Sequence, residues 1–487
     1  METIKKYKSF IWLSALAFTV CISSCNKWLD VDPDSRVKDD KFFAEEAGFK
    51  NLLNGAYITM GDTEAYGREL SYGLVDVLAH TYTWLQNSDA RRPYIDAMDG
   101  LYANAPTQQL IHNAWSKSYN VIANLNILME RLENADRSIF QPKNYEIIKG
   151  EAYGLRAFLH FDLLRLFSTS YLAGGENLPA IPYKKMYGTS LTPVSTAKEV
   201  VNEILSDLKV AEELLKVDPI FTGEVIATTT DEGYLSERKL RFNYYAVKAL
   251  QARVYQWIGD SANALSAAKT VIDVSSTKFP WVLNSALTGE EIVKDRVFTT
   301  EFVFGLYQPK MLENQTGYLT ELSAVTGIGL VMSAATRDQI YPVSESAADV
   351  RAVYLLRFEG SNTYLGRLEQ HADRVERFSK RMPIIRIPEM YYIAAEAEAI
   401  SNPAKAVEYL ATVRSMRGVS GSLSPALTSE QINAEIQKEM RKEYASEGHL
   451  FYYYKRLNKT AVPGHVGPYN TARYKLPLPP AEIEFGI

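Results

Sequence analysis

The sequence predicts a mainly α-helical fold, and three observations lead to that prediction. In the stretch 386–418, apolar residues recur at gaps of three and four, the spacing of one face of an α-helix. Asn402 and Pro403 interrupt this stretch with residue types that cap a helix and open its first turn. The stretch 244–273 repeats the design. Because such pairs bury their apolar faces by stacking on neighbours, we expect an all-α fold of tetratricopeptide-like helix pairs in an α-solenoid, with long irregular loops and minor β structure.

The two stretches match each other at the positions that define a tetratricopeptide-like pair. Each has a residue facing the turn, a small turn residue and then small or aliphatic residues on the second helix. In the stretch 244–273 these are Tyr255, Gly259, Ala264, Ala268 and Val271, and in the stretch 386–418 they are Ala397, Ser401, Ala406, Leu410 and Val413. Gly418 stands where a left-handed C-terminal cap would end the second helix.

The N-terminus has the pattern of a targeting segment. Three lysines precede the apolar run 10–22, which is shorter than the roughly 20 residues needed to span a bilayer. The run ends in Ile22-Ser23-Ser24-Cys25, the pattern of a bacterial lipobox. We therefore predict a lipoprotein-type signal peptide over 1–24, lipidation at Cys25 and a lipid-anchored tether over 25–42.

An ordinary secretory signal with an incidental cysteine is the alternative to a lipobox. The chain has two cysteines, Cys21 and Cys25, and both lie in this segment. Cleavage before Cys25 would leave one cysteine at the tip of the mature chain, so neither an internal disulfide nor thiol catalysis is possible. The cysteine count therefore favours the lipobox.

The rest of the chain, 43–487, is expected to form one helical domain. Further helices are expected over about 43–60, 68–80, 108–133, 150–167 and 194–215, with one long helix from 429 to 457. Arg156 and Arg165 lie inside an apolar helix, so each needs a carboxylate or carbonyl partner. For His160, on the same helix, a hydrogen-bonded core position is the expected role.

Two segments break the helical pattern, at about 80–106 and 275–350. The first has weak periodicity and is rich in aromatic residues, Asn, Asp and Arg. A loop of that length inside a compact chain is usually functional. In the second, alternating apolar residues over 297–308 predict a half-buried strand.

Composition limits the classes of function. The chain has 487 residues, of which 46% are hydrophobic, and this is enough for a large core. Its formal net charge is −5 and it contains no basic run, which argues against a nucleic-acid partner. Tyrosine is abundant, with 31 residues against 19 Phe. Tyrosine seals helix packing and also forms the floor of many binding sites.

The sequence shows no catalytic motif. It contains no HExxH, no GxSxG, no Walker loop and no Cys/His cluster that could hold zinc. We therefore expect a binding protein with no catalytic residue, no metal and no cofactor. A surface glycoside hydrolase with two catalytic carboxylates stays open as an alternative, because the chain has 58 acidic residues.

An EF-hand calcium loop is excluded because two of the residues that it requires are missing. Asp30, Asp32 and Asp34 have the spacing of an EF-hand, but Ser35 and Lys41 occupy the positions of its glycine and its glutamate.

Several motifs together resemble those of the SusD/RagB family of outer-membrane lipoproteins. GEAYGLRAFLHFDLLRLF, over 150–167, resembles the family's GEA-x-x-LRA-x-x-x-x-x-L-x-R helix. The family's R-x-x-EMY-x-x-AEA helix is matched by Arg386, Glu389, Met390, Tyr391, Ala395, Glu396 and Ala397, and its terminal helix by Glu443, Glu447, Gly448 and Arg456. The closing LPLPPAEI resembles the family's IP-x-x-E-x segment. The chain departs from the pattern at Met440, Leu450 and Tyr453, where charged residues are usual.

The resemblance implies a cell-surface receptor at the outer membrane, lipid-anchored and facing the exterior. Such a receptor would dock on a SusC-like TonB-dependent outer-membrane transporter and deliver captured oligosaccharides to it. In relatives that bind peptides the ligand would be a peptide, and this alternative stays open.

Neutral sugars are held by aromatic rings that stack on C–H faces and by polar side chains that bond hydroxyls. The segment 80–106 supplies this mixture, so the candidate ligand-binding residues are chosen by their position in it. They are Tyr82, Trp84, Asn87, Asp89, Arg91, Tyr94 and Tyr102, with Trp281 and Tyr318 from the second irregular segment. For any one of these aromatic residues, a packing role is the alternative.

Overall fold

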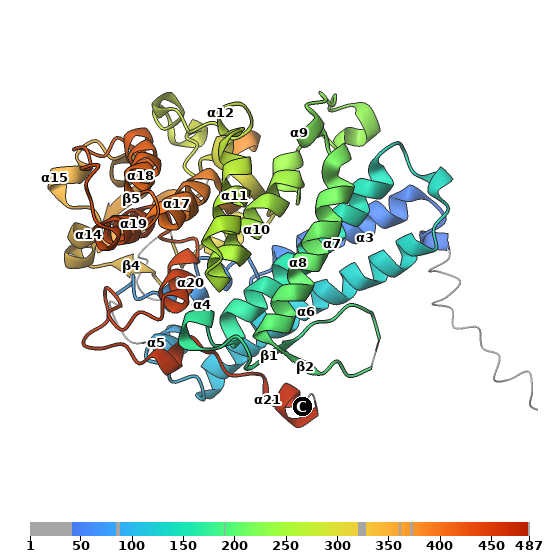
Figure 1. The fold of residues 1–487 in the computed structure, drawn as a ribbon, viewed down its shortest axis with the longest axis horizontal. Coiled ribbons are helices and arrows are strands. Elements are labelled where there is room, and N and C mark those ends of the chain that lie inside the picture. The colour runs from blue at the N-terminus through green and yellow to red at the C-terminus, as the bar shows by residue number, and fades with distance from the viewer. Residues whose placement is uncertain are drawn as a thin grey trace, which may run out of the picture.

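The structure is a computed structural model that describes residues 41–83, 88–188, 190–319, 328–359, 362–370, 373 and 375–485. Long helices side by side form the body of the molecule, and the strands are short (Figure 1). The predicted fold class, mainly α-helical with minor β structure, is confirmed. No helix in the described part of the chain is both long enough and apolar enough to cross a bilayer.

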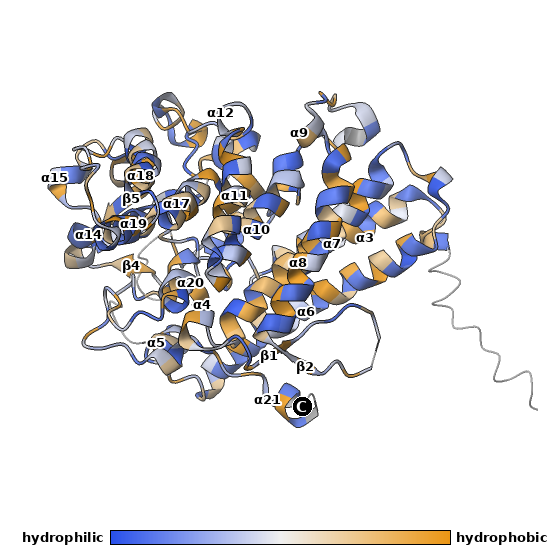
Figure 2. Cartoon of the chain, viewed as in Figure 1, coloured by the Kyte–Doolittle hydropathy of each residue, from blue (hydrophilic) through white to orange (hydrophobic). Residues whose placement is uncertain are grey.

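Four long helices pack against one another in the N-terminal half. They are α3 (Glu46–Met60), α6 (Ala105–Glu133), α7 (Asn144–Phe167) and α8 (Ala197–Leu214). Helix α6 packs on α3 and α7, and α7 packs on α8. Figure 2 shows apolar colour concentrated where α6, α7 and α8 meet, with polar colour on outward-facing turns. The expected partners inside α7 are present: Arg156 donates to Asp207 at 2.7 and 2.8 Å, and Arg165 pairs with Asp162.

The predicted helix pairs form as α10 (Tyr244–Ile258) with α11 (Ser261–Ile272), and α17 (Ile387–Glu398) with α18 (Pro403–Arg417). Helix α11 packs against α17, so the two pairs lie side by side, and α10 continues the row onto α8. Gly259 and Gly418 end the helices with φ of 80° and 72°. A Cβ on Gly418 would lie 2.4 Å from the Ala348 carbonyl oxygen, so this position requires glycine.

The remaining helices are short except for α19 (Ser429–Glu443). They are α4 (Leu74–Val77), α5 (Arg92–Met98), α9 (Pro219–Thr222), α12 (Ser275–Lys278), α13 (Met311–Gln315), α14 (Ala334–Ile340), α15 (Val343–Ser346), α16 (Val350–Leu355), α20 (His449–Arg456) and α21 (Pro480–Phe485). Capping boxes at Thr196 and Thr428 open α8 and α19.

Within the described residues the strands form three small antiparallel sheets. In the described residues β1 (Pro179–Pro182) pairs with β2 (Val194–Thr196), β3 (Phe302–Tyr307) pairs with β7 (Arg381–Arg386), and β6 (Asn362–Leu365) lies between β4 (Val331–Met332) and β5 (Leu356–Glu359). The predicted strand near 297–308 exists, but the prediction that it is half-buried is wrong. β3 is buried on both faces up to Leu306, because β7 covers one edge and α3 and α10 pack on it.

The single helix predicted from 429 to 457 is divided into α19 and α20. Ser446 and Gly448 between them have φ of 69° and 73°. Their backbone N–H groups donate to the buried carboxylate of Asp76, at 2.9 and 3.2 Å. These tertiary hydrogen bonds outweigh the helical propensity of the segment.

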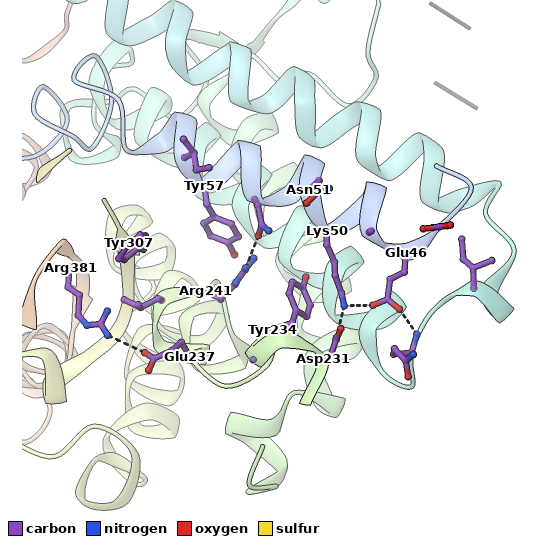
Figure 3. Close-up of a pocket in the computed structure, with 18 residues that line it drawn as sticks. Glu46, Lys50, Asn51, Tyr57, Asp231, Tyr234, Glu237, Arg241, Tyr307 and Arg381 are labelled. Carbon is purple, nitrogen blue, oxygen red and sulfur yellow. Dashed lines mark hydrogen bonds and ion pairs between the residues drawn. The ribbon is translucent and has the colours of Figure 1, made fainter. Parts of the chain in front are cut away.

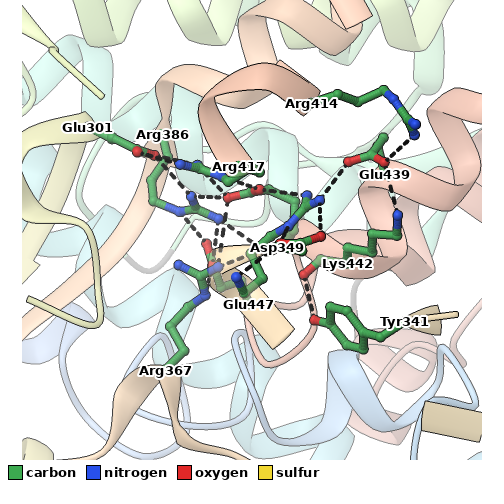
Figure 4. A network of polar contacts seen from close by, with 12 residues as sticks. Glu301, Tyr341, Asp349, Arg367, Arg386, Arg414, Arg417, Glu439, Lys442 and Glu447 are labelled. Carbon is green, nitrogen blue, oxygen red and sulfur yellow. Dashed lines mark hydrogen bonds and ion pairs between the residues drawn. The ribbon is translucent and has the colours of Figure 1, made fainter. Parts of the chain in front are cut away.

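A network of buried ion pairs links the C-terminal elements (Figure 4). At its centre Glu443, at the end of α19, accepts from Arg386 at 2.5 Å, from Arg417 at 2.8 and 2.9 Å and from Arg351 at 3.1 Å. Arg417 also donates to both oxygens of Glu301 at 2.7 Å. All five side chains are fully buried.

The charge of Glu443 is set by this network. Burial alone would raise the pKa of Glu443, but the guanidinium groups of Arg417, Arg386 and Arg351 hold that pKa well below its usual value. The carboxylate therefore stays ionised in the fold.

Replacing Glu443 with glutamine should lower the free energy of unfolding by about 3–5 kcal/mol, because three buried guanidinium groups lose their shared anion. Urea unfolding followed by circular dichroism measures this change. Glu408→Gln on α18 removes an exposed carboxylate and should change stability by less than about 1 kcal/mol. Equal effects of the two substitutions would contradict the role assigned to Glu443.

Candidate functional site

Two segments distant in sequence, one leading into α5 and one leading into β4, are joined by hydrogen bonds. The backbone N–H of Thr83 donates to the carbonyl oxygen of Val331 at 2.7 Å. The buried side chain of Arg91 donates from Nε to the carbonyl oxygen of Ile328 at 2.7 Å. These bonds hold the segment that leads into α5 against the segment that leads into β4.

Tyr318 lies at the centre of an aromatic and charged group between these segments. The guanidinium of Arg68 lies 4.6 Å from the Tyr318 ring centroid, within range of a cation–π interaction. The rings of Tyr72 and Tyr94 meet Tyr318 edge-on, with centroids 6.3 and 6.1 Å away. We call Arg68, Glu69, Tyr72, Tyr94 and Tyr318 the Tyr318 cluster.

Glu69 is the buried acceptor of this cluster. Its Oε1 accepts from Arg68 Nε at 2.6 Å and from the Tyr94 hydroxyl at 2.9 Å. Its Oε2 accepts from the backbone N–H of Leu74 at 3.0 Å. Burial raises the pKa of Glu69, and these donors oppose that rise. The only formal charges in the cluster are therefore paired with each other.

The surface that the cluster offers is aromatic and polar. Tyr318 is half-buried, and 22% of the Arg68 side chain is exposed. Tyr72 is buried, and its hydroxyl makes no hydrogen bond with the described residues. The described part of the chain contains no group of three or more His, Cys, Asp or Glu side chains that could hold a metal ion.

The structure brings two of the predicted ligand-binding residues, Tyr94 and Tyr318, into contact. Arg91 bonds to the carbonyl oxygen of Ile328, in the segment that leads into β4. Asp89 is exposed just before Arg91. Two others, Trp84 and Asn87, lie outside the described residues.

The other candidates lie elsewhere. Tyr82 is buried and donates its hydroxyl to Asp76. Tyr102 is buried and donates to the carbonyl oxygen of Arg473 at 2.6 Å. Trp281 packs with its centroid 5.4 Å from that of Tyr391, near the buried network. For these three the assignment as ligand contacts stays a prediction.

Arg68, Glu69 and Tyr72 were not among the predicted residues. Sequence periodicity predicts a helix over 68–80, whereas the structure has turns there and only the short helix α4. The one local signal that could have identified these three residues is that they lie close together in the sequence.

The fold and this cluster define a helical protein whose loops carry an aromatic and polar surface. A family model described as starch-binding and associating with the outer membrane matches residues 27–256, and a model described as the SusD family matches residues 362–480. The chain belongs to the SusD/RagB family.

Known relatives agree with this membership. The SusD-like protein P38 of Formosa agariphila is 27% identical over 220 residues, which are 44% of this chain and 39% of that protein's length. A solved SusD superfamily protein from Bacteroides thetaiotaomicron superposes with a TM-score of 0.69 at 21% identity, covering 90% of this chain and 97% of that chain. A SusD-like carbohydrate binding protein from Bacteroides vulgatus gives 0.70 at 17% identity, covering 91% and 97%. At these identities the two structures show a shared fold.

Substituting Tyr94 with phenylalanine should lower the free energy of unfolding by about 1–3 kcal/mol, because the buried Glu69 carboxylate loses one of its donors. Urea denaturation of the purified protein measures the change. Tyr187→Phe, at a position that is 60% exposed, should leave the urea midpoint unchanged. A Tyr94→Phe midpoint equal to that of wild type would contradict a contribution of this hydrogen bond.

Proposed function

We propose that this protein binds oligosaccharides at the bacterial cell surface and delivers them to a partner TonB-dependent outer-membrane transporter of the SusC type. Membership in the SusD/RagB family is the observation that carries the proposal. One matching family model is described as starch-binding and associating with the outer membrane, and one solved relative is described as carbohydrate binding. No catalytic activity is proposed.

The Tyr318 cluster is the proposed ligand surface. Arg68 lies over one face of the half-buried Tyr318 ring, so we assign sugar C–H contacts to the part of the ring that this cation leaves open and hydroxyl contacts to the exposed part of the guanidinium. The paired charges of Arg68 and Glu69 favour a ligand without formal charge, because an ionic ligand would compete with that pair. Trp84 and Asn87, which the sequence predicts as contacts, are proposed to act with the cluster.

Anchoring at the outer membrane is a second part of the proposal. It rests on the lipobox pattern that ends at Cys25, which lies outside the described residues. A signal peptide over 1–24 and a tether over 25–42 would leave the helical domain exposed to the exterior.

Tyr318→Ala should weaken oligosaccharide binding by about 1–3 kcal/mol, the scale of losing one aromatic anchor. The sequence predicts the same for Trp84→Ala. A glycan array identifies a bound oligosaccharide, and calorimetry on each variant measures its affinity. Tyr187→Ala, on an exposed loop, serves as the matched control and should bind as wild type does.

The same titration separates the receptor from its alternatives. The oligosaccharide should be recovered chemically intact after long incubation. Turnover that disappears with a single Asp or Glu substitution would identify a glycoside hydrolase instead. Selective binding of peptides, with no affinity for any glycan, would identify a peptide receptor.

Cys25→Ala should abolish lipid labelling and release the protein from the membrane fraction, because the lipobox would lose the cysteine whose thiol is lipidated. Metabolic labelling with a fatty-acid analogue and membrane fractionation of cells measure both effects. Cys21→Ala is the matched control and should leave labelling intact. Membrane retention and labelling that persist in Cys25→Ala would refute the anchor.

A further inference from the structure

A groove of about 900 Å³ lies between α3, the 3-10 segments η4 (Thr230–Gly233) and η5 (Arg238–Leu240), and the adjoining ends of β3 and β7. Figure 3 shows tyrosine side chains in its middle part and ion pairs toward both ends. None of the residues that line it belongs to the Tyr318 cluster. The groove is therefore a second concave surface with its own chemistry.

Most of the charged groups in this groove are paired with other residues of the protein. At one end Lys50 Nζ lies 2.7 Å from Glu46 Oε1 and 2.5 Å from Asp231 Oδ2. At the other end Arg381 Nη2 lies 3.8 Å from Glu237 Oε2. An ionic ligand would compete with these pairs, and its own contacts would have to offset the free energy lost when the pairs break. The arrangement therefore disfavours a charged ligand.

Arg241, in the middle of the groove, is also engaged. Its Nη2 donates to Asn54 Oδ1 at 2.7 Å, and its Nη1 lies 3.8 Å from the buried carboxylate of Glu151. Lys50 and Arg241 both lie over the ring of Tyr234, at 4.4 and 4.8 Å from its centroid. That ring is therefore occupied by cations of the protein.

The groups that remain open to a ligand are mostly uncharged. Within the described residues, the side-chain amides of Asn51 and Gln141 make no hydrogen bond, and both residues are exposed. Tyr307 and Ile58 both line the groove and are 41% and 60% exposed. Glu45, exposed at the edge, can accept from a hydroxyl group. One open aromatic ring with amide donors and acceptors is the chemistry that holds a neutral sugar chain.

We propose that this groove is a second binding site for a neutral oligosaccharide, with the Tyr307 ring stacking on a sugar and the amides of Asn51 and Gln141 bonding hydroxyls. The proposal rests on the proposed function for the class of ligand, but it uses a separate surface. A volume of about 900 Å³ accommodates several sugar units and falls in the range of ligand sites.

The test is calorimetry on the full chain with neutral hexasaccharides of α-1,4-glucose, β-1,4-glucose, β-1,3-glucose and β-1,4-mannose, and with a galacturonic acid hexamer as the acidic control. The variant Tyr318→Ala weakens binding at the cluster, and the part of the remaining binding that depends on Tyr307 then reports the groove. Adding Tyr307→Ala to this variant should weaken that binding about tenfold, whereas adding Tyr307→Phe or Tyr187→Ala should change it less than about twofold. Circular dichroism confirms that each variant is folded.

The outcomes separate the two sites. Loss of all binding in Tyr318→Ala alone would overturn the groove and leave the proposed function standing. Residual binding that Tyr307→Ala does not alter, or that prefers the galacturonic acid hexamer, would also overturn it. Binding that Tyr307→Ala abolishes and Tyr318→Ala leaves unchanged would support the groove and remove the cluster as the ligand surface. If the wild-type chain binds none of the neutral hexasaccharides, the groove assignment fails.

Discussion

The C-terminal half of the fold depends on one buried carboxylate, that of Glu443. A carboxylate removed from water costs several kcal/mol unless cations compensate it, and here Arg351, Arg386 and Arg417 do so together. These arginines come from α16, from the end of β7 and from α18, while Glu443 ends α19. Because none of the four groups is stable alone in the interior, these elements have to assemble around each other. The helix pair α17–α18 is thereby fixed to the strand that precedes it.

The sequence motifs identified some residues of this network, but they did not predict which residues pair with each other. Arg386, Glu443 and Glu447 stand at motif positions, and the structure pairs Arg386 with both glutamates. Arg456 and Glu396, also at motif positions, pair at 2.6 Å through two contacts. Glu301 and Arg351 gave no signal, because neither belongs to a sequence motif and each meets its partners only through the fold. Helical periodicity located the pairs α10–α11 and α17–α18, but it missed the break after α19. There the backbone N–H groups donate to Asp76, which is distant in sequence.

The candidate site also shows what residue type and position in the sequence cannot predict. Residue type and loop position selected Tyr94 and Tyr318, whose hydroxyls the fold brings within 3.4 Å across more than two hundred residues. They could not predict that Tyr82, Tyr94 and Tyr102 are all buried, with hydroxyls that bond inside the protein. Tyrosine serves packing and recognition with the same ring and the same hydroxyl, so only its surroundings separate the two roles. Arg68 and Tyr72 were missed because their turn sits in a stretch with helical spacing.

Paired charges occur both in the interior of the protein and at the two proposed ligand surfaces. In the interior, pairing is the condition for burying arginine and glutamate at all. At the Tyr318 cluster and in the groove, pairing has a different consequence, because it leaves aromatic faces and neutral amides as the groups that a ligand can meet. Since the ion pairs at the surface are part of the folded framework, a charged ligand would have to break protein contacts to gain its own. A neutral, hydroxyl-rich ligand would gain contacts without that loss, and this difference gives both surfaces their expected selectivity for uncharged sugars.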